Sequence, residues 1–143
     1  MKMMKKISFV LAAVLSILLV CPIGAQAQTR SSQYLGTYAA SISQGDTSGE
    51  IVVNFSILAE KSLPKIGALK IDIYRTSGDR AVTIWGSTSN GLLSPKSSIR
   101  YSYSYTYKGI PTVSYYAVVT VCAGTSTSYD TRTVKTSVVQ APK

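Results

Sequence analysis

The chain has 143 residues, with 15 basic and 6 acidic side chains, no histidine and a net charge of +9 at pH 7. This length allows one domain with a sufficient core, and the lack of histidine removes the usual base of catalytic triads and the commonest metal ligand. The basic residues are scattered rather than gathered in runs, which argues against a nucleic-acid-binding protein.

The first 27 residues have the pattern of a secretory signal peptide. Three lysines precede an apolar run over residues 7–20, and the segment AQA at residues 25–27 supplies the small-x-small cleavage motif. The run is too short to span a bilayer, which needs about 20 residues. We therefore expect a secreted or cell-surface protein, processed to residues 28–143, with no stable membrane insertion after cleavage.

Processing changes both the cysteine count and the charge. Cys21 leaves with the signal peptide, because Val20 stands where a bacterial lipobox requires Gly, Ala or Ser. The mature chain then holds only Cys122 and has no internal disulfide. Cleavage takes three of the 15 basic residues away and leaves 12 against six acidic ones, a net charge of +6. Such a diffuse positive charge favours solubility, or loose attraction to anionic cell-wall polymers and acidic glycans.

Short segments rich in Val, Ile, Thr and Tyr follow, separated by turn residues. The expected strands cover residues 34–43, 50–58, 66–75, 80–86, 99–107, 112–123 and 131–139, with loops at 61–65 and 87–98. This spacing predicts one all-β domain, an immunoglobulin-like antiparallel β-sandwich of about seven strands, with a small β-barrel as the alternative.

Alternation within the strands predicts which side chains point inward. In the third strand we expect Leu69, Ile71 and Ile73 to face the core, and in the fourth strand Trp85 lies on the opposite side from Val82 and Ile84.

The segment from Tyr115 to Gly124, YYAVVTVCAG, resembles the long sixth strand of fibronectin type III and other immunoglobulin-like domains. With SYDTRT at residues 128–133 and the final strand, the resemblance covers about 25 residues. The tryptophan of the second fibronectin strand is missing, and Phe55 takes a similar place. The whole chain is similar to small exported immunoglobulin-like proteins of Gram-positive bacteria. That resemblance implies a fold and a compartment in a bacterium but no activity.

No arrangement of side chains predicts catalysis. The six carboxylates show no preferred pair, and Cys122 lies between Val121 and Ala123, with no cation beside it in sequence to lower its pKa. The turn from Asp46 to Glu50 lacks the dense oxygen spacing of a calcium loop. We expect no enzyme activity, no cofactor and no metal site.

The segment from Ile99 to Lys108 places tyrosines at every second position. Tyr101, Tyr103, Tyr105 and Tyr107 share one side of the expected strand, and small or basic residues share the other. The polar side would make a poor core, so the tyrosines are expected inward. Four buried phenols need four hydrogen-bond partners, however, which leaves open a platform at the rim that stacks on sugar rings or a partner.

Three further residues are candidates for function. Trp85 joins the platform or packs under a loop, and Tyr129 lies in a Ser/Thr-rich turn typical of adaptable binding loops or of a solvated hairpin tip. Cys122 is a small buried hydrophobe or forms an intermolecular disulfide. We therefore expect a non-catalytic interaction module for a glycan, a cell-wall component or a protein. The alternative is a structural surface protein that self-associates through edge strands.

Overall fold

The computed structural model describes residues 32–143. The predicted signal peptide, its cleavage site after Ala27 and Cys21 lie outside the described residues. Within this range, no helix is long and apolar enough to cross a membrane.

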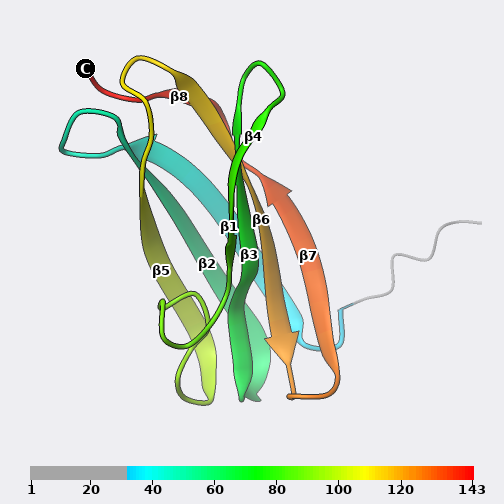
Figure 1. The fold of residues 1–143 in the computed structure, drawn as a ribbon. Helices are drawn as coiled ribbons and strands as arrows, with labels where there is room; N and C mark the ends of the chain where they lie inside the picture. The colour runs from blue at the N-terminus through cyan, green and yellow to red at the C-terminus, as the bar shows by residue number, and fades with distance from the viewer. Residues whose placement is uncertain (1–31) are drawn as a thin grey trace, which may run out of the picture. The chain divides into compact units, whose positions relative to one another are not determined.

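Eight strands make up the described chain (Figure 1). They are β1 (Leu35–Gln44), β2 (Glu50–Leu63), β3 (Lys65–Arg75), β4 (Arg80–Trp85), β5 (Ser98–Lys108), β6 (Ser114–Gly124), β7 (Tyr129–Lys135) and β8 (Val139–Gln140). Every strand pair is antiparallel, and five of the seven longer strands have 10 to 14 residues. The expected all-β class is confirmed.

The strands form two sheets. One has the order β1-β2-β5, and the other has the order β4-β3-β6-β7, with the short β8 paired to β6. In Figure 1, β3 and β4 lie towards the viewer and β1 and β2 lie behind them. No strand pairing joins the two sheets within residues 32–143. The domain is therefore an antiparallel β-sandwich, and the barrel alternative is wrong.

The inner faces of the two sheets supply the core. Ile51, Val53 and Ile57 on β2 are buried, and β6 buries every second residue from Tyr115 to Ala123. This two-residue period is what a half-covered strand requires, because successive side chains point to opposite faces. Burial of the valine and isoleucine side chains among them, worth about 1.5–3 kcal/mol each, is a main favourable term that holds the sheets together.

Some boundaries differ from the sequence prediction. The expected loop at 61–65 is almost absent, because β2 continues to Leu63 and β3 begins at Lys65. The prediction that Leu69 faces the core is also wrong. The β3–β6 register shifts between Ala68 and Lys70, so Ala68 takes the buried position and Leu69 is only half-buried. A bulge of this kind places one extra residue in a strand and cannot be seen in simple alternation.

The segment between β4 and β5 is packed onto β3 rather than being a free loop. Leu92 is fully buried, and its carbonyl accepts a hydrogen bond from the Ala68 amide at 2.7 Å. The Ser94 amide donates to the Ile66 carbonyl at 2.9 Å. Between these two contacts Gly67 has a φ of 147°, and a Cβ there would meet the Leu92 carbonyl oxygen. The close approach therefore depends on glycine at position 67.

Candidate functional site

The four tyrosines of β5 lie on the inner side of the β1-β2-β5 sheet. The register sets Tyr101, Tyr103, Tyr105 and Tyr107 opposite Ile57, Phe55, Val53 and Ile51, which are all core residues. Tyr101, Tyr105 and Tyr107 are half-buried and pack against the core. Tyr103 is 38% exposed. Because β5 is an edge strand, its rings close the side of the sandwich instead of filling its centre.

The tyrosines also find local partners. The Tyr101 hydroxyl donates a hydrogen bond to the Gly91 carbonyl, and its ring lies 6.2 Å from that of Phe55. Burial, with a smaller contribution from Tyr103, raises the pKa of Tyr101. Tyr107 packs edge-on against Tyr115, with 6.1 Å between ring centroids. Through these contacts, most of the four tyrosines of β5 have a structural role.

Trp85 lies in a different layer of the molecule. It is opposite Lys70 in the β3–β4 ladder, on the side away from Ile84, and is 70% exposed. The β5 tyrosines lie between the sheets, whereas Trp85 lies on the outer face of the β4-β3-β6-β7 sheet. The structure therefore does not bring Trp85 and the four tyrosines onto one shared sheet face.

Tyr129 shares the outer face with Trp85, at the start of β7. It is opposite Gly124 on β6 and is 40% exposed. Its neighbour Asp130 points the other way and accepts hydrogen bonds from the Ser32 hydroxyl and the Tyr34 amide, both at 2.7 Å. The start of β7, just after the turn that the sequence offered as a binding loop or a solvated hairpin tip, is thus fixed to the residues before β1.

Three pairs of one aromatic ring and one lysine occupy the outer face of the β4-β3-β6-β7 sheet, which we call the aromatic–lysine face. The pairs are Lys65 over Tyr129 at 3.7 Å, Lys135 over Tyr116 at 4.6 Å and Lys70 over Trp85 at 5.8 Å, measured from the ammonium nitrogen to the ring centroid. The quadrupole of an aromatic ring attracts an ammonium group that lies within about 6 Å of the ring face. Lys70 and Trp85 are directly opposite each other, Lys135 and Tyr116 lie on neighbouring strands, and Lys65 reaches Tyr129 across Gly124 of β6. The strand registers therefore set the geometry of all three pairs.

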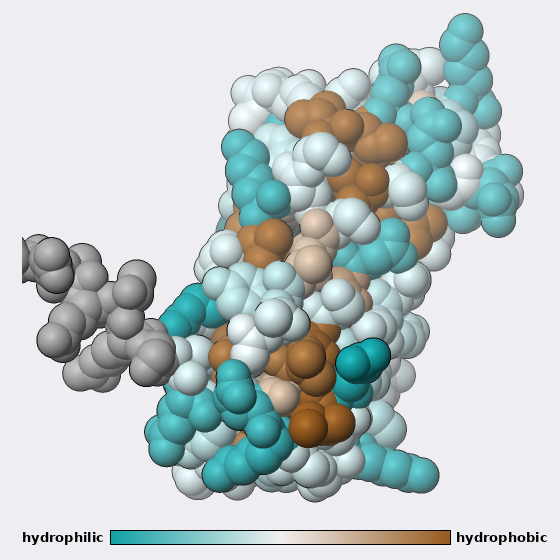
Figure 2. All heavy atoms as spheres, turned by 180° about the vertical axis from the view of Figure 1, so that it is seen from behind, coloured by the Kyte–Doolittle hydropathy of each residue, from teal (hydrophilic) through white to brown (hydrophobic). Residues whose placement is uncertain are grey.

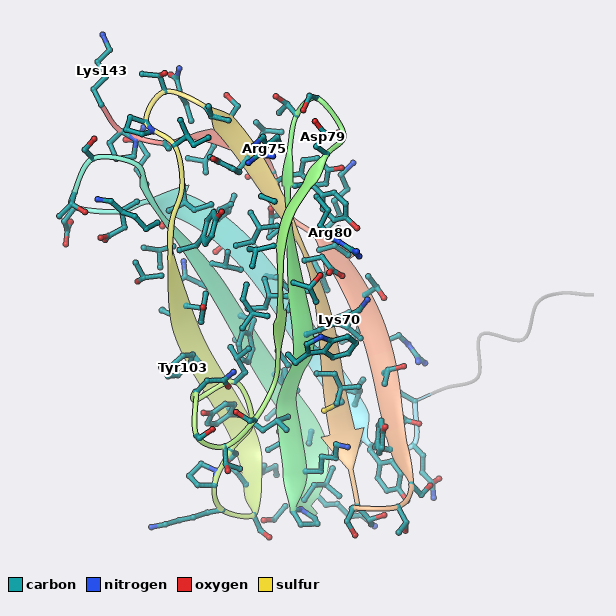
Figure 3. All side chains as sticks on the ribbon, viewed as in Figure 1. Lys70, Arg75, Asp79, Arg80, Tyr103 and Lys143 are labelled. Carbon is teal, nitrogen blue, oxygen red and sulfur yellow. The ribbon has the colours of Figure 1, made fainter. Side chains whose placement is uncertain are left out.

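Two further contacts extend this face. Tyr74 and Tyr116 stack with 5.2 Å between ring centroids and an interplanar angle of 11°. Asp72 lies between Lys70 and Arg80, at 3.1 Å and 3.9 Å, and accepts a hydrogen bond from Thr83. Lys70 and Arg80 both project from the β3–β4 side of the molecule (Figure 3).

Asp72 is the one acidic side chain on this face among the described residues, and it is 3% exposed. Its burial favours the neutral acid and raises the pKa. The hydrogen bonds from Thr83 and Lys70 and the charges of Lys70 and Arg80 outweigh burial, so the pKa of Asp72 is lowered overall. The carboxylate therefore stays charged and holds two cations in place.

Sequence reasoning missed most of this face. It selected Trp85 and Tyr129 but did not connect them with Lys65, Lys70 or Lys135. These residues lie on three strands, β3, β4 and β7, whose registers the sequence does not give. One local signal was available. The alternation that placed Ile71 and Ile73 inward also places Lys70 and Asp72 together on the outer side.

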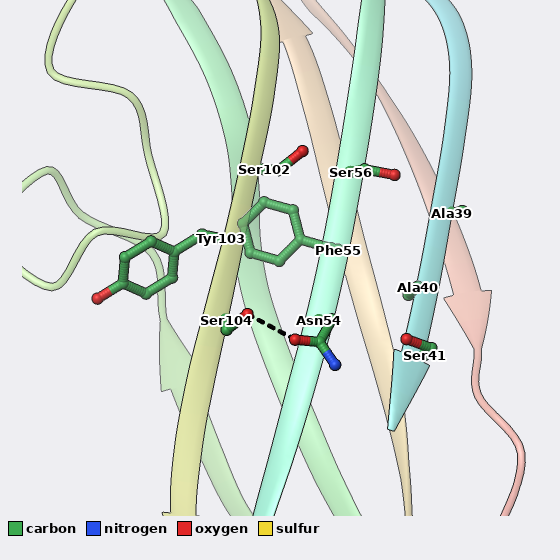
Figure 4. Close-up of a pocket in the computed structure, with 9 residues that line it drawn as sticks. All are labelled: Ala39, Ala40, Ser41, Asn54, Phe55, Ser56, Ser102, Tyr103 and Ser104. Carbon is green, nitrogen blue, oxygen red and sulfur yellow. Dashed lines mark hydrogen bonds between the residues drawn. The ribbon is translucent and has the colours of Figure 1, made fainter. Parts of the chain in front are cut away.

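The outer face of the other sheet has a contrasting character. Rows of small side chains run across it, among them Ala39–Ser56–Ser102 and Ser41–Asn54–Ser104. These rows border an open, shallow hollow of about 630 Å³, in which the Ser104 hydroxyl donates to Asn54 (Figure 4). The Tyr103 ring points away from these small side chains.

Figure 2 shows the molecule from behind, where pale surface separates brown patches and strongly hydrophilic side chains gather mainly towards the ends.

Cys122 is fully buried on β6, opposite Gly67 on β3 and Thr131 on β7. Burial raises the pKa of its thiol to about 11, against smaller lowering effects of the Lys65 charge and a backbone hydrogen bond at Gly67. A disulfide to a second chain requires this sulfur to reach the surface, and in the folded domain it does not.

The described residues hold no group of three or more His, Cys, Asp or Glu side chains that could bind a metal ion together. The residues that the structure does gather at the surface are aromatic rings, lysines and hydroxyls. Such groups can make stacking contacts, hydrogen bonds and ion pairs with a ligand.

Comparison with models of known protein families found no match, and comparison with curated proteins found none either.

Proposed function

We propose that this protein is a secreted or surface-associated bacterial interaction module, without catalytic activity, that binds a glycan, a cell-wall component or a protein partner. The observation that carries the proposal is the position of Trp85, the single tryptophan of the chain, with 70% of its side chain exposed on a sheet face. An exposed indole contributes little to the core, whereas tryptophan is among the residues most enriched at binding hot spots.

The surroundings of Trp85 support the same proposal. Its ring is held beside Lys70, and Lys70 is in turn paired with the nearly buried Asp72. An aromatic side chain on a rigid strand needs little further ordering when a ligand binds, which favours affinity. The lack of histidine in the sequence supports the non-catalytic part of the proposal.

We also propose that the domain belongs with the fibronectin type III-like exported proteins of Gram-positive bacteria that it resembles in sequence. The division of its longer strands into the orders β1-β2-β5 and β4-β3-β6-β7 supports this assignment.

A glycan array and a pull-down with purified cell walls test the proposed function. We expect the protein to bind at least one class of glycan or wall material, and Trp85→Ala to weaken that binding. Tyr38→Ala is a matched control, because Tyr38 is also exposed, at 39%, but lies on β1 of the other sheet. Failure to bind any glycan, wall fraction or extracellular protein would contradict the proposal, as would equal losses in the two variants.

Self-association is the second candidate function, and the edge strands favour it. β1 carries no charged residue, and β5 carries only Arg100 and Lys108, near its two ends. Long edge strands with few charges can pair with other copies. The expected result is a mass in solution that rises with protein concentration. A constant monomer mass over the accessible range of concentrations would contradict this alternative.

A further inference from the structure

We propose that the aromatic–lysine face binds an anionic polysaccharide, with its rings stacked on sugar units and its cations paired with carboxylate, phosphate or sulfate groups. This inference rests on the proposed function and specifies both the surface and the ligand class.

Charge is the first argument. The outer face of the β4-β3-β6-β7 sheet carries four cations, contributed by Lys65, Lys70, Arg80 and Lys135, against the single carboxylate of Asp72. Its net charge is therefore +3. Three of the other five acidic residues belong to β2 or to the turn before it, in the opposite sheet. A face with one dominant sign of charge raises the local concentration of a ligand of the opposite sign.

The pairing of rings and cations is the second argument. In each of the three pairs the ammonium lies within 5.8 Å of the ring centroid. A sugar unit that stacks on Trp85 or Tyr129 would therefore carry its acidic substituent into the reach of Lys70 or Lys65. A neutral polymer can stack on the ring of each pair but has no charged group to pair with the lysine. An acidic polymer can use both groups and therefore fits this face better.

Threonine side chains are also part of this face. Thr83, Thr120 and Thr133 share the outer face with Lys70 and Trp85. Threonine hydroxyls both donate and accept hydrogen bonds, as the hydroxyl groups of a sugar do. Bases of a nucleic acid or side chains of an acidic peptide would match this mixture of stacking and hydroxyl groups less completely, so we commit to a polysaccharide.

The spacing of the three ring–lysine pairs along β3 predicts a ligand of several sugar units. Lys70 and Tyr74 are four residues apart on β3, and the strand rise sets them about 14 Å apart along the face. Lys65 lies at the opposite end of β3, beside Tyr129. A single sugar covers one pair only, whereas a chain along β3 can contact all three. Affinity should therefore rise steeply with the length of the oligosaccharide.

Calorimetric titration of the protein, isolated from cells that express the full chain, tests this inference. The probes are polygalacturonate and its short oligomers, neutral dextran, polyglutamate and an oligothymidylate. We expect polygalacturonate to bind, with an affinity that falls as the sodium chloride concentration rises, and dextran to bind at least about tenfold more weakly.

Variants locate the site. Trp85→Ala should weaken polygalacturonate binding about tenfold, and Lys65→Ala, Lys70→Ala and Lys135→Ala about threefold each. Lys96→Ala and Lys108→Ala remove the same charge from exposed positions outside this face and should change affinity less than about twofold. Thermal unfolding of each variant shows whether it is folded.

The outcomes separate the two proposals. Equal losses in the face variants and in the two control variants would overturn the assignment of the surface. If dextran binds as tightly as polygalacturonate and Trp85→Ala weakens both, the proposed function holds and the anionic ligand class is wrong. Equally tight binding of polyglutamate or oligothymidylate would also overturn the polysaccharide class. If polygalacturonate does not bind, this inference fails. The proposed function fails only if the glycan array and the wall fractions are negative as well.

Discussion

The ammonium nitrogen of Lys65 lies 3.7 Å from the centre of the Tyr129 ring, which joins the first residue of β3 to the first residue of β7. These positions are 64 residues apart in the chain, and β6 lies between their strands in the sheet. The pair closes one end of the aromatic–lysine face and covers the region of the sheet where Cys122 is buried.

Breaking this pair should have a small but measurable cost. A double-mutant cycle with Lys65→Met and Tyr129→Leu is expected to give a coupling free energy of about 0.5–1 kcal/mol, as for exposed cation–π contacts. Urea denaturation of the four proteins measures it. The same cycle with Lys96→Met in place of Lys65→Met should give no coupling, and a zero value for Lys65 would show that the ring and the ammonium do not interact in solution.

Asp72 should make stability depend on pH in the acidic range. Its pKa is lower in the folded protein than in the unfolded chain, whose usual value is about 3.9. Its stabilising contribution is therefore complete above that value and is lost as the pH falls through the folded pKa. Asp72→Asn should destabilise the protein by about 1–2 kcal/mol at neutral pH and flatten the decline below pH 4.

The matched control for this effect is Asp79→Asn, at the exposed tip of the β3–β4 hairpin. Denaturation curves recorded from neutral to acidic pH compare the two variants. A pH dependence in Asp72→Asn as steep as in the unaltered protein would contradict the assigned role of this carboxylate.

Cys122 should be inert in the folded protein. Its thiol is fully buried and has a pKa of about 11, so the reactive thiolate is scarce at pH 8 and out of reach. Labelling with a thiol reagent should be slow in buffer and rapid in denaturant. Fast labelling under native conditions, or a dimer that disappears with reductant, would instead favour the self-associating alternative.

Gly67→Ala should be among the most destabilising single substitutions. Gly67 has a φ of 147°, and an added Cβ would collide with the Leu92 carbonyl oxygen. We expect a loss of about 2–4 kcal/mol, because both the strand and the docked segment between β4 and β5 must move. Gly78→Ala is a useful comparison, because Gly78 also has a positive φ, of 100°, but an added Cβ meets no atom within 4 Å. Equal effects of the two substitutions would show that backbone conformation alone determines the cost.

Much of the fold could be predicted from the sequence because alternation in the strands is local. The inward set on β2 and the opposite sides of Trp85 and Ile84 follow from the two-residue period alone. The bulge beside Leu69 could not be predicted, because it depends on how β3 pairs with β6. Nor could the burial of Leu92, whose polar, glycine-containing surroundings resemble those of an exposed loop.

The candidate site was less predictable for the same physical reason. A row of tyrosines on one strand is visible in sequence, but an outer face assembled from β3, β4, β6 and β7 depends on three strand registers. Trp85 and Tyr129 were found as single residues by their type. Their lysine partners became apparent only when the sheet set Lys70 opposite Trp85 and Lys65 close to Tyr129.

The most direct test of the central claim uses Trp85 as a built-in reporter, because it is the single tryptophan of the chain. Its fluorescence is measured while polygalacturonate is added, with dextran as the control titration. If the aromatic–lysine face is the binding site, the emission shifts to shorter wavelength and saturates, because the exposed indole becomes covered by sugar. If calorimetry shows that polygalacturonate binds while the Trp85 emission stays unchanged, the ligand lies elsewhere and the account is wrong.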